Sequence, residues 1–374
     1  MEQITLSFPA SRALSGRALA GVVGSGDMEV LYTAAQSATL NVQITTSVDN
    51  SQARWQALFD RLNLINGLPA GQLIIHDFGA TPGVARIRIE QVLRRPLMRN
   101  DRSFIELRAR ERAHALLDDG SYRELLDPFD GIMSPWLGAQ GIVPQSDDGM
   151  VVAKGTINGQ PAVVIAIEGT FRGGSMGEVS GAKMAAALEL AAEDNRNGIP
   201  TQAVLCLETG GVRLQEANLG LAAIADIHAA IVDLRRYTPV VGIIAGTVGC
   251  FGGMSIAAAL CSYLIVTREA RLGLNGPQVI EQEAGIEEYD SRNRPFIWSM
   301  TGGEIRAASG LVDALVSDGV NAVKTAMNEA IAKGVPVQHR SDNYDDYLRR
   351  LSQFDTRQQA DTAQIKQLFA REDK

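Results

Sequence analysis

The chain has 374 residues, with 35 lysines and arginines against 43 aspartates and glutamates, so its formal net charge is −8. A hydrophobic content of 45% and a charged content of 21% are typical of a soluble globular protein, and the length predicts two or three domains. No basic run suits nucleic-acid binding, and no apolar run reaches membrane-span length. Cys206, Cys250 and Cys261 lie in apolar surroundings, which indicates buried thiols of a reducing compartment, so we expect a cytoplasmic protein.

Residues 1–97 predict a small α+β module. The alternation over 39–46 predicts a strand, and the apolar spacing over 53–64 predicts a helix. Two further strands are predicted over 72–76 and 84–90. The glycine-rich and proline-containing segment between those two strands predicts a hairpin turn.

A polar, basic segment over 93–102 indicates a domain boundary, which we set between residues 97 and 98. Met98 is either the remnant of a second start codon or an ordinary internal methionine, and the sequence leaves both possibilities open. A new helical pattern follows over 103–117.

From Gly149 onward, apolar β-branched runs alternate with helical patterns, which predicts a largely parallel sheet covered on both faces. A polar tail from Lys333 contains two amphipathic stretches, and each is either a solvated helix or a clamp for a partner. The predicted strands are 161–168, 202–208, 239–245, 263–267 and 270–274, and the predicted helices are 179–197, 214–237, 251–260, 344–354 and 363–369.

Three glycine clusters interrupt this part of the chain, at 172–177 (RGGSMG), 208–216 (ETGGVRLQE) and 249–255 (GCFGGMS). Each follows a β-branched run and precedes a helical pattern, so backbone N–H groups are expected to converge beside helix N-termini. Glycines also serve tight turns and close packing, but three successive clusters favour a shared role. Backbone donors without a nearby nucleophile suit an enolate oxygen. The predicted donors to a thioester carbonyl are Gly210, Gly211, Gly252 and Gly253.

Five segments resemble known families. GTINGQP at 155–161, GGSMG at 173–177, TGGVRLQE at 209–216 and GPQVIEQ at 276–282 resemble carboxyltransferase β subunits of acyl-CoA carboxylases, and AASGLVDA at 307–314 is similar to a crotonase-superfamily segment. The combination resembles the β subunit of biotin-independent malonate decarboxylase. This resemblance covers residues 98 to about 335 and implies an α/β, crotonase-like ββα superhelix over 98–374, ending in a helical tail.

The N-terminal module resembles the δ subunit, the acyl carrier, of the same complex. The matching segments are GVVGSGDME at 21–29 and IHDFGATPG at 75–83. In that family the matching serine, here Ser25, bears a phosphoribosyl-dephospho-CoA group through a phosphodiester. Taken alone, the Gly-Ser-Gly sequence would be a turn. The Asp-Ser-Leu signature of ordinary phosphopantetheine carriers is missing, which suits an unusual prosthetic group.

The sequence lacks several residues and motifs of related families, and these differences exclude some reactions and cofactors. Ile256 and Gly276 stand where superfamily hydratases carry their two glutamates, so an ordinary hydratase is not expected. A zinc ribbon and a biotin-attachment motif are both missing, and we expect neither metal nor biotin. The remaining polar candidates are expected to be structural. The histidines are scattered, with no catalytic or metal-binding spacing. Arg172 and Arg213 are expected to pair with Glu208 and Glu216, and Ser175 and Ser180 are expected to cap helices.

The resemblance implies decarboxylation of malonyl-S-carrier to acetyl-S-carrier and CO2 in malonate catabolism, through a thioester enolate held by backbone N–H groups. The proton donor to the enolate is not identified. The implied partners are a γ subunit supplying a second carboxyltransferase-like half, an α subunit moving malonate onto the carrier, and a prosthetic-group transferase. The alternatives are a biotin-dependent acyl-CoA carboxyltransferase β subunit and a non-catalytic carrier or scaffold.

Overall fold

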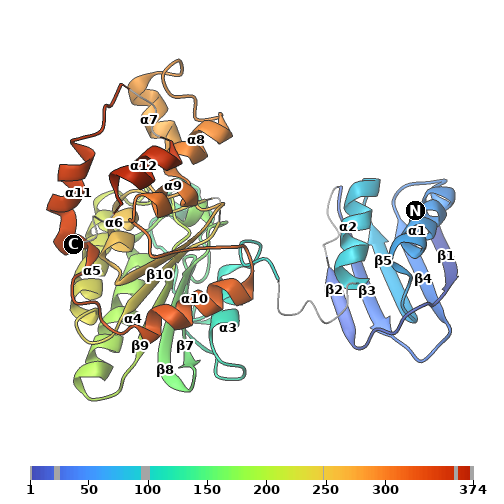
Figure 1. The fold of residues 1–374 in the computed structure, drawn as a ribbon. Helices are drawn as coiled ribbons and strands as arrows, with labels where there is room; N and C mark the ends of the chain where they lie inside the picture. Colours follow the sequence, from blue (N-terminus) through green and yellow to red (C-terminus); the bar gives the residue numbers. More distant parts are fainter. Residues whose placement is uncertain (1, 21–25, 94–101, 247, 358–360, 371–374) are drawn as a thin grey trace. The chain divides into compact units, whose positions relative to one another are not determined.

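The computed structural model describes residues 2–20, 26–93, 102–246, 248–357 and 361–370 (Figure 1). The chain divides into two compact units, Met1–Asn100 and Asp101–Lys374. The domain boundary predicted between residues 97 and 98 lies outside the described residues. Each unit is therefore considered by itself.

The first unit is a five-stranded sheet with two helices (Figure 1). Neighbouring strands run in the order β1-β4-β5-β3-β2, and the β4–β5 pair is parallel. Apolar side chains from the strands and both helices form one core. The elements are β1 Glu2–Pro9, β2 Arg17–Ala20, β3 Met28–Ala34, β4 Thr39–Thr46, α1 Gln52–Asn66, β5 Gly71–Asp77 and α2 Pro82–Leu93.

The predictions for β4, α1 and β5 are confirmed, but the predicted strand over 84–90 is wrong. This segment belongs to α2, and no hairpin precedes it. Pro82 suits the first turn of a helix, where its missing N–H is not needed. Ala85, Ile89 and Val92 recur at helical spacing and are buried, which outweighs the local alternation of apolar and charged residues.

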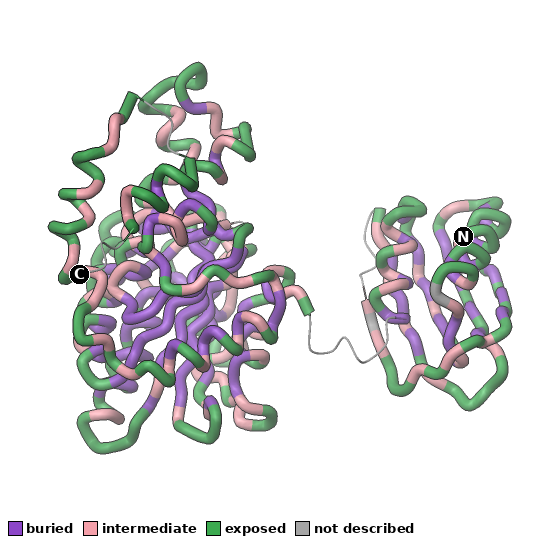
Figure 2. Tube along the Cα trace, in the orientation of Figure 1, coloured by how far each residue is buried: buried purple, intermediate pink, exposed green. Residues whose placement is uncertain are grey.

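The second unit is built on a seven-stranded sheet in the order β12-β11-β10-β9-β8-β7-β6. Adjacent strands from β8 to β12 pair in parallel, whereas the β6–β7 and β7–β8 pairs are antiparallel. The strands are β6 Arg123–Leu125, β7 Met150–Ile157, β8 Gln160–Ile167, β9 Gln202–Cys206, β10 Val240–Ile244, β11 Tyr263–Thr267 and β12 Ala314–Val316. Figure 2 shows most of the sheet as buried.

Helices cover both faces of this sheet, as predicted. One core cluster contains residues of α4, α5 and α6, and the other contains residues of α3 and α10. The helices are α3 Ala109–Leu116, α4 Glu178–Arg196, α5 Asn218–Leu234, α6 Gly253–Leu260, α7 Pro277–Ala284, α8 Arg294–Thr301, α9 Gly303–Ala308, α10 Val320–Ala332, α11 Tyr344–Leu351 and α12 Thr362–Leu368. None of the helices in the described ranges is long and apolar enough to cross a membrane.

Three predicted elements of this unit differ from the structure. The helix predicted from residue 103 begins at Ala109, and the helix predicted from residue 214 begins at Asn218. Residues 270–274 form isolated bridges and not a strand, because Leu272 pairs with Cys250 while Arg271 pairs with Gly302. All three cysteines are buried, as predicted, and burial raises the pKa of the Cys206 and Cys261 thiols to about 12.

Close packing of α4 on α5 depends on Gly181, which gives a stability prediction. A Cβ atom at Gly181 would lie 2.4 Å from the Cβ of Ala223. We expect Gly181→Ala to lower the free energy of unfolding by about 1–3 kcal/mol, because the helices must separate. Gly138→Ala is the control, since its Cβ would enter open space. Equal urea midpoints for the two variants would contradict the prediction.

Candidate functional site

The three glycine clusters meet in the second unit, as the sequence predicts. The first and second clusters are joined by a hydrogen bond from the Gly210 amide to the Gly173 carbonyl (2.8 Å). The second and third are joined by bonds from the Thr209 amide to the Gly249 carbonyl (2.7 Å) and from the Phe251 amide to the Thr209 carbonyl (3.0 Å). Turns from three successive strand-to-helix connections therefore share one site.

Close backbone approach requires glycine at this site. Gly174 has a φ of +65°, and a Cβ atom there would lie 1.9 Å from the Glu208 carbonyl oxygen. Gly211 has a φ of +105°, and its Cβ would lie 3.2 Å from the Cα of Gly252. Side chains at these positions would push the clusters apart.

Only part of the predicted donor set remains available. The Gly210 amide donates to Gly173, the Gly211 amide to Thr209 Oγ1 (3.0 Å), and the Gly252 amide to the Leu274 carbonyl (2.7 Å). Within the described ranges, the Gly253 amide has no acceptor. Gly210, Gly211 and Gly252 therefore build the turn, while Gly253 offers a donor.

The sequence analysis missed a second donor of this kind, Val212. Its amide has no acceptor among the residues that the structure describes, and a Cβ atom at Gly252 would lie 3.8 Å from its nitrogen. The expectation that every cluster leads directly into a helix also fails here, because α5 begins only at Asn218. Gly253 is the first residue of α6, so its amide also benefits from the positive end of that helix dipole.

Helix α5 supports the start of α6 through two side chains. The Nε2 atom of His228 lies 2.8 Å from the Gly253 carbonyl oxygen, at hydrogen-bond distance. A Cβ atom at Gly253 would lie 2.8 Å from Cγ2 of Ile224, one turn earlier on α5. The sequence gives no sign of this role for His228, because the histidines are scattered and the contact depends on how the two helices pack.

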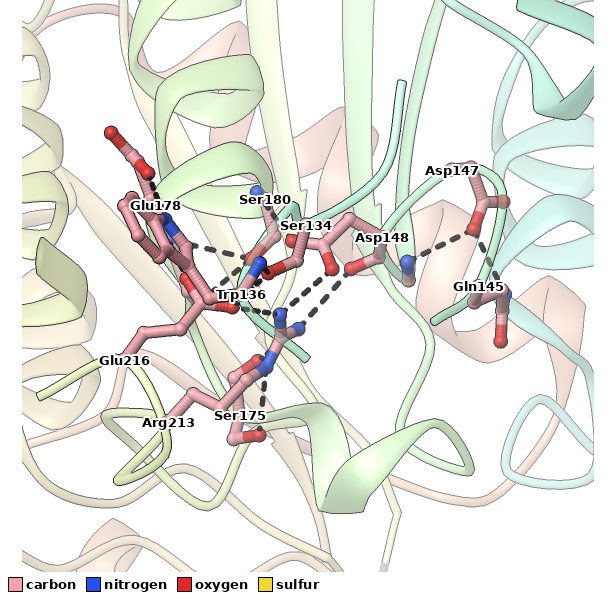
Figure 3. A network of polar contacts seen from close by, with 12 residues as sticks. Ser134, Trp136, Gln145, Asp147, Asp148, Ser175, Glu178, Ser180, Arg213 and Glu216 are labelled. Carbon is pink, nitrogen blue, oxygen red and sulfur yellow. Dashed lines mark hydrogen bonds and ion pairs between the residues drawn. The ribbon is translucent and has the colours of Figure 1, made fainter. Parts of the chain in front are cut away.

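A buried polar network around Arg213 connects the second glycine cluster to neighbouring segments of the chain (Figure 3). The Arg213 side chain is fully buried, and its Nη1 atom lies 2.7 Å from Asp148 Oδ1 and 3.0 Å from Glu216 Oε1. Its Nη2 atom donates to the Ser175 carbonyl (3.0 Å). The predicted pairing of Arg213 with a glutamate is confirmed. Ser180 acts as predicted, since its Oγ accepts from the Gly177 amide at the start of α4.

Glu216 is a structural carboxylate in this network. It accepts from Ser134 Oγ and from the Glu178 amide, both at 2.6 Å. Burial alone would raise its pKa, but these hydrogen bonds and Arg213 hold the pKa of Glu216 below its ordinary value. An ionised, fully bonded carboxylate is a poor general acid.

The predicted partner of Glu208 is wrong. Glu208 pairs with Arg112 of α3 (3.0 Å), and its other oxygen accepts from the Gly249 amide (2.9 Å). Arg112 is 96 positions earlier in the chain, so only the tertiary fold brings the pair together. Glu208 thereby links the second and third clusters.

Ser25 lies outside the described residues, but its neighbours are described. The Gly26 amide donates to the Phe78 carbonyl (3.0 Å), and the Phe78 amide donates to the Asp27 carbonyl (3.1 Å). Among the residues that the structure describes, chain neighbours aside, no atom lies within 4 Å of a Cβ built at Gly26.

Comparison with known families assigns both units. The family model of the malonate decarboxylase delta subunit matches residues 15–96, and that of the carboxyl transferase domain matches residues 106–360. The second match covers more than half of the chain. The chain belongs to the carboxyl transferase domain family. Its N-terminal unit is an acyl-carrier domain of the malonate decarboxylase delta type, so the chain combines an acyl-carrier domain with a carboxyl transferase domain.

Individual relatives agree with this assignment. The chain is 40% identical over 243 residues to the malonyl-S-ACP:biotin-protein carboxyltransferase of Malonomonas rubra, covering 62% of this chain and 76% of that protein. It is 54% identical over 93 residues to a malonate decarboxylase acyl carrier protein of Pseudomonas aeruginosa, covering 25% of this chain and 94% of that one.

Solved structures confirm the predicted crotonase-like carboxyltransferase fold. A chain of the Pseudomonas malonate decarboxylase hetero-tetramer in complex with malonate is 70% identical, with a TM-score of 0.70 over 72% of this chain and 97% of that chain. A chain of the transcarboxylase 12S hexamer is 28% identical, with a TM-score of 0.51 over 60% of this chain and 42% of that chain.

Proposed function

We propose that this chain removes the carboxylate of a malonyl thioester carried on its own N-terminal unit, releasing CO2 and leaving an acetyl thioester in malonate catabolism. The observation that carries the proposal is the fusion of a malonate decarboxylase acyl-carrier domain to a carboxyltransferase domain. A carrier and an active site in one chain are produced in equal amounts and act on a shared intermediate.

The carrier group proposed for Ser25 is a phosphoribosyl-dephospho-CoA attached through a phosphodiester. The open space at Gly26 and the pairing of Asp27 with Arg88 fit such a group, because neither bulk nor an unpaired carboxylate opposes the phosphate. When bound, this group supplies the terminal thiol that forms the thioester. Neither biotin nor a metal ion is part of the proposal.

Backbone amides perform the central step. When the bond between the α-carbon and the carboxylate breaks, its electron pair moves toward the thioester oxygen, and a proton then joins the α-carbon. The Gly253 amide, with the neighbouring Val212 amide, stabilises the negative charge that develops on that oxygen. Gly210, Gly211 and Gly252 hold these donors in place. Donors fixed before the reaction favour the transition state over the substrate.

We further propose that partner subunits complete the site. Exposed apolar side chains adjoin the glycine clusters: Leu214 is 79%, Leu274 60% and Ile256 46% exposed. A γ subunit covering them would exclude water from the thioester, and an α subunit would load malonate onto the carrier. A prosthetic-group transferase would mature Ser25. The isolated, unmodified chain is therefore expected to be inactive.

A second candidate is transfer of the malonyl carboxylate to a biotin protein. The observation in its favour is the 40% identity to a malonyl-S-ACP:biotin-protein carboxyltransferase. The test is CO2 release from labelled malonate by the assembled, modified complex with and without avidin. Release that is insensitive to avidin supports direct decarboxylation, whereas release that avidin abolishes supports the biotin route.

The Gly253 donor gives a kinetic prediction. A Cβ atom at Gly253 would crowd Ile224 and displace the amide, so we expect Gly253→Ala to lower the decarboxylation rate of the complex by about tenfold to a hundredfold. Adding Ile224→Ala removes the crowding, and the double variant is expected to recover most of the lost rate. Wild-type turnover by Gly253→Ala alone would contradict the assignment of this donor.

A further inference from the structure

The chain immediately after Ser25 is held by backbone pairing that extends beyond the regular strands. In the β3–β5 ladder Met28 lies opposite Asp77. The bonds between Gly26 or Asp27 and Phe78 continue this ladder, so Gly26 is fixed one residue from the serine. Gly26 itself has a φ of +78°, a conformation that favours glycine.

A side-chain clamp from α2 holds the next residue. The Nε and Nη2 atoms of Arg88 lie 3.0 and 2.8 Å from the two carboxylate oxygens of Asp27. The Met28 amide also donates to Asp27 Oδ1 (2.8 Å). The hydrogen bonds from Arg88 hold the pKa of Asp27 below its ordinary value, so the carboxylate is ionised and paired at neutral pH.

The position of Arg88 on its helix is itself fixed. Its neighbour Ile89 is fully buried, and Ala85 and Val92 anchor the same face of α2 in the core. The bidentate contact therefore connects a rigid helix to the segment that follows the serine. Most surface ion pairs join two flexible side chains and fix neither backbone, whereas this clamp joins two anchored elements.

We propose that Asp27 and Arg88 are positioning residues that present Ser25 to the enzyme attaching its phosphate-bearing group. The inference rests on the proposed function, which assigns that modification to Ser25. In the attachment, the serine oxygen forms a bond to phosphorus, the bond from phosphorus to the donor's leaving phosphate breaks, and the hydroxyl proton is released. The clamp fixes the backbone at Asp27, two positions after the serine in the sequence, and pairs the Asp27 carboxylate so that it does not repel a phosphate-bearing donor.

The test measures the initial rate of Ser25 modification by mass spectrometry of the Ser25 peptide. The full chain, in the unmodified form, is treated with the purified transferase and an activated phosphoribosyl-dephospho-CoA donor. The variants are Arg88→Met, Arg88→Lys and the double variant Asp27→Asn/Arg88→Met. Arg86→Met is the matched control, because Arg86 lies on the same helix and pairs with Glu90 within it (2.7 Å).

We expect Arg88→Met to slow modification by about tenfold or more through kcat, with the KM for the donor unchanged, because attack depends on orientation. Arg88→Lys recovers part of the rate through a single hydrogen bond. Asp27→Asn/Arg88→Met stays slow, since neutral side chains remove the repulsion but not the loss of positioning. Arg86→Met is modified at the wild-type rate.

Three outcomes would overturn the inference: Arg88→Met modified as fast as Arg86→Met, a full rescue in the double variant, or a loss of rate matched by thermal unfolding of the domain at the assay temperature. In each case wild-type Ser25 is still modified and the proposed function stands. An unmodified wild-type chain would instead contradict the proposed function itself.

Discussion

Ser25→Ala is expected to abolish malonate decarboxylation by the assembled complex. Without the hydroxyl no phosphodiester forms, no thiol is delivered, and the amides of Gly253 and Val212 have no thioester to act on. The expected rate is that of the uncatalysed reaction, a loss of at least about a millionfold for a typical enzyme, measured as CO2 released from labelled malonate.

Ser37→Ala is the control, because Ser37 is an exposed serine of the same unit whose hydroxyl bonds to the Thr39 carbonyl. It is expected to match the wild type. Substantial CO2 release by Ser25→Ala would mean that a free thioester, or a carrier on another chain, serves the site.

Arg213→Met is expected to lower the free energy of unfolding of the 101–374 unit by about 3–5 kcal/mol, because it leaves Asp148 and Glu216 buried without their cation. The midpoint of urea unfolding, followed by a signal from this unit, measures the effect. The loss exceeds that of a typical single substitution because two carboxylates lose the same partner.

Arg236→Met is the matched control. Arg236 also contacts an acidic residue three positions away, Asp233, but its side chain is exposed. Its loss is expected to cost less than about 1 kcal/mol. Equal effects of the two substitutions would show that the buried network contributes little, and that the second glycine cluster is held by its backbone bonds alone.

Much of the second unit can be predicted from the sequence, because sheet strands that are buried on both faces appear as continuous apolar runs. Strands such as β10 and β11 consist mainly of β-branched or apolar residues, and neither face needs polar positions. In the first unit, part of α2 is predicted as a strand because Arg86, Arg88 and Glu90 alternate with apolar residues. Its true signal is the buried set Ala85, Ile89 and Val92, which follows helical spacing.

The donor set could be predicted only in part. Glycine clusters indicate where backbones approach, but not which amides are already bonded. The Gly252 amide is occupied by the Leu274 carbonyl, which only the tertiary fold brings near. Val212 was missed because a β-branched residue carries no sign of an available amide. The Arg112–Glu208 pair spans 96 positions and leaves no local pattern.

The most direct test of the account is the mass of the Ser25 peptide from the assembled complex, sampled at intervals after malonate is added. The account predicts a prosthetic group on Ser25 that carries first malonyl and then acetyl, with the conversion slowed in Gly253→Ala. A Ser25 peptide that stays unmodified while CO2 is released, or a malonyl form that persists in the wild-type complex, would contradict it.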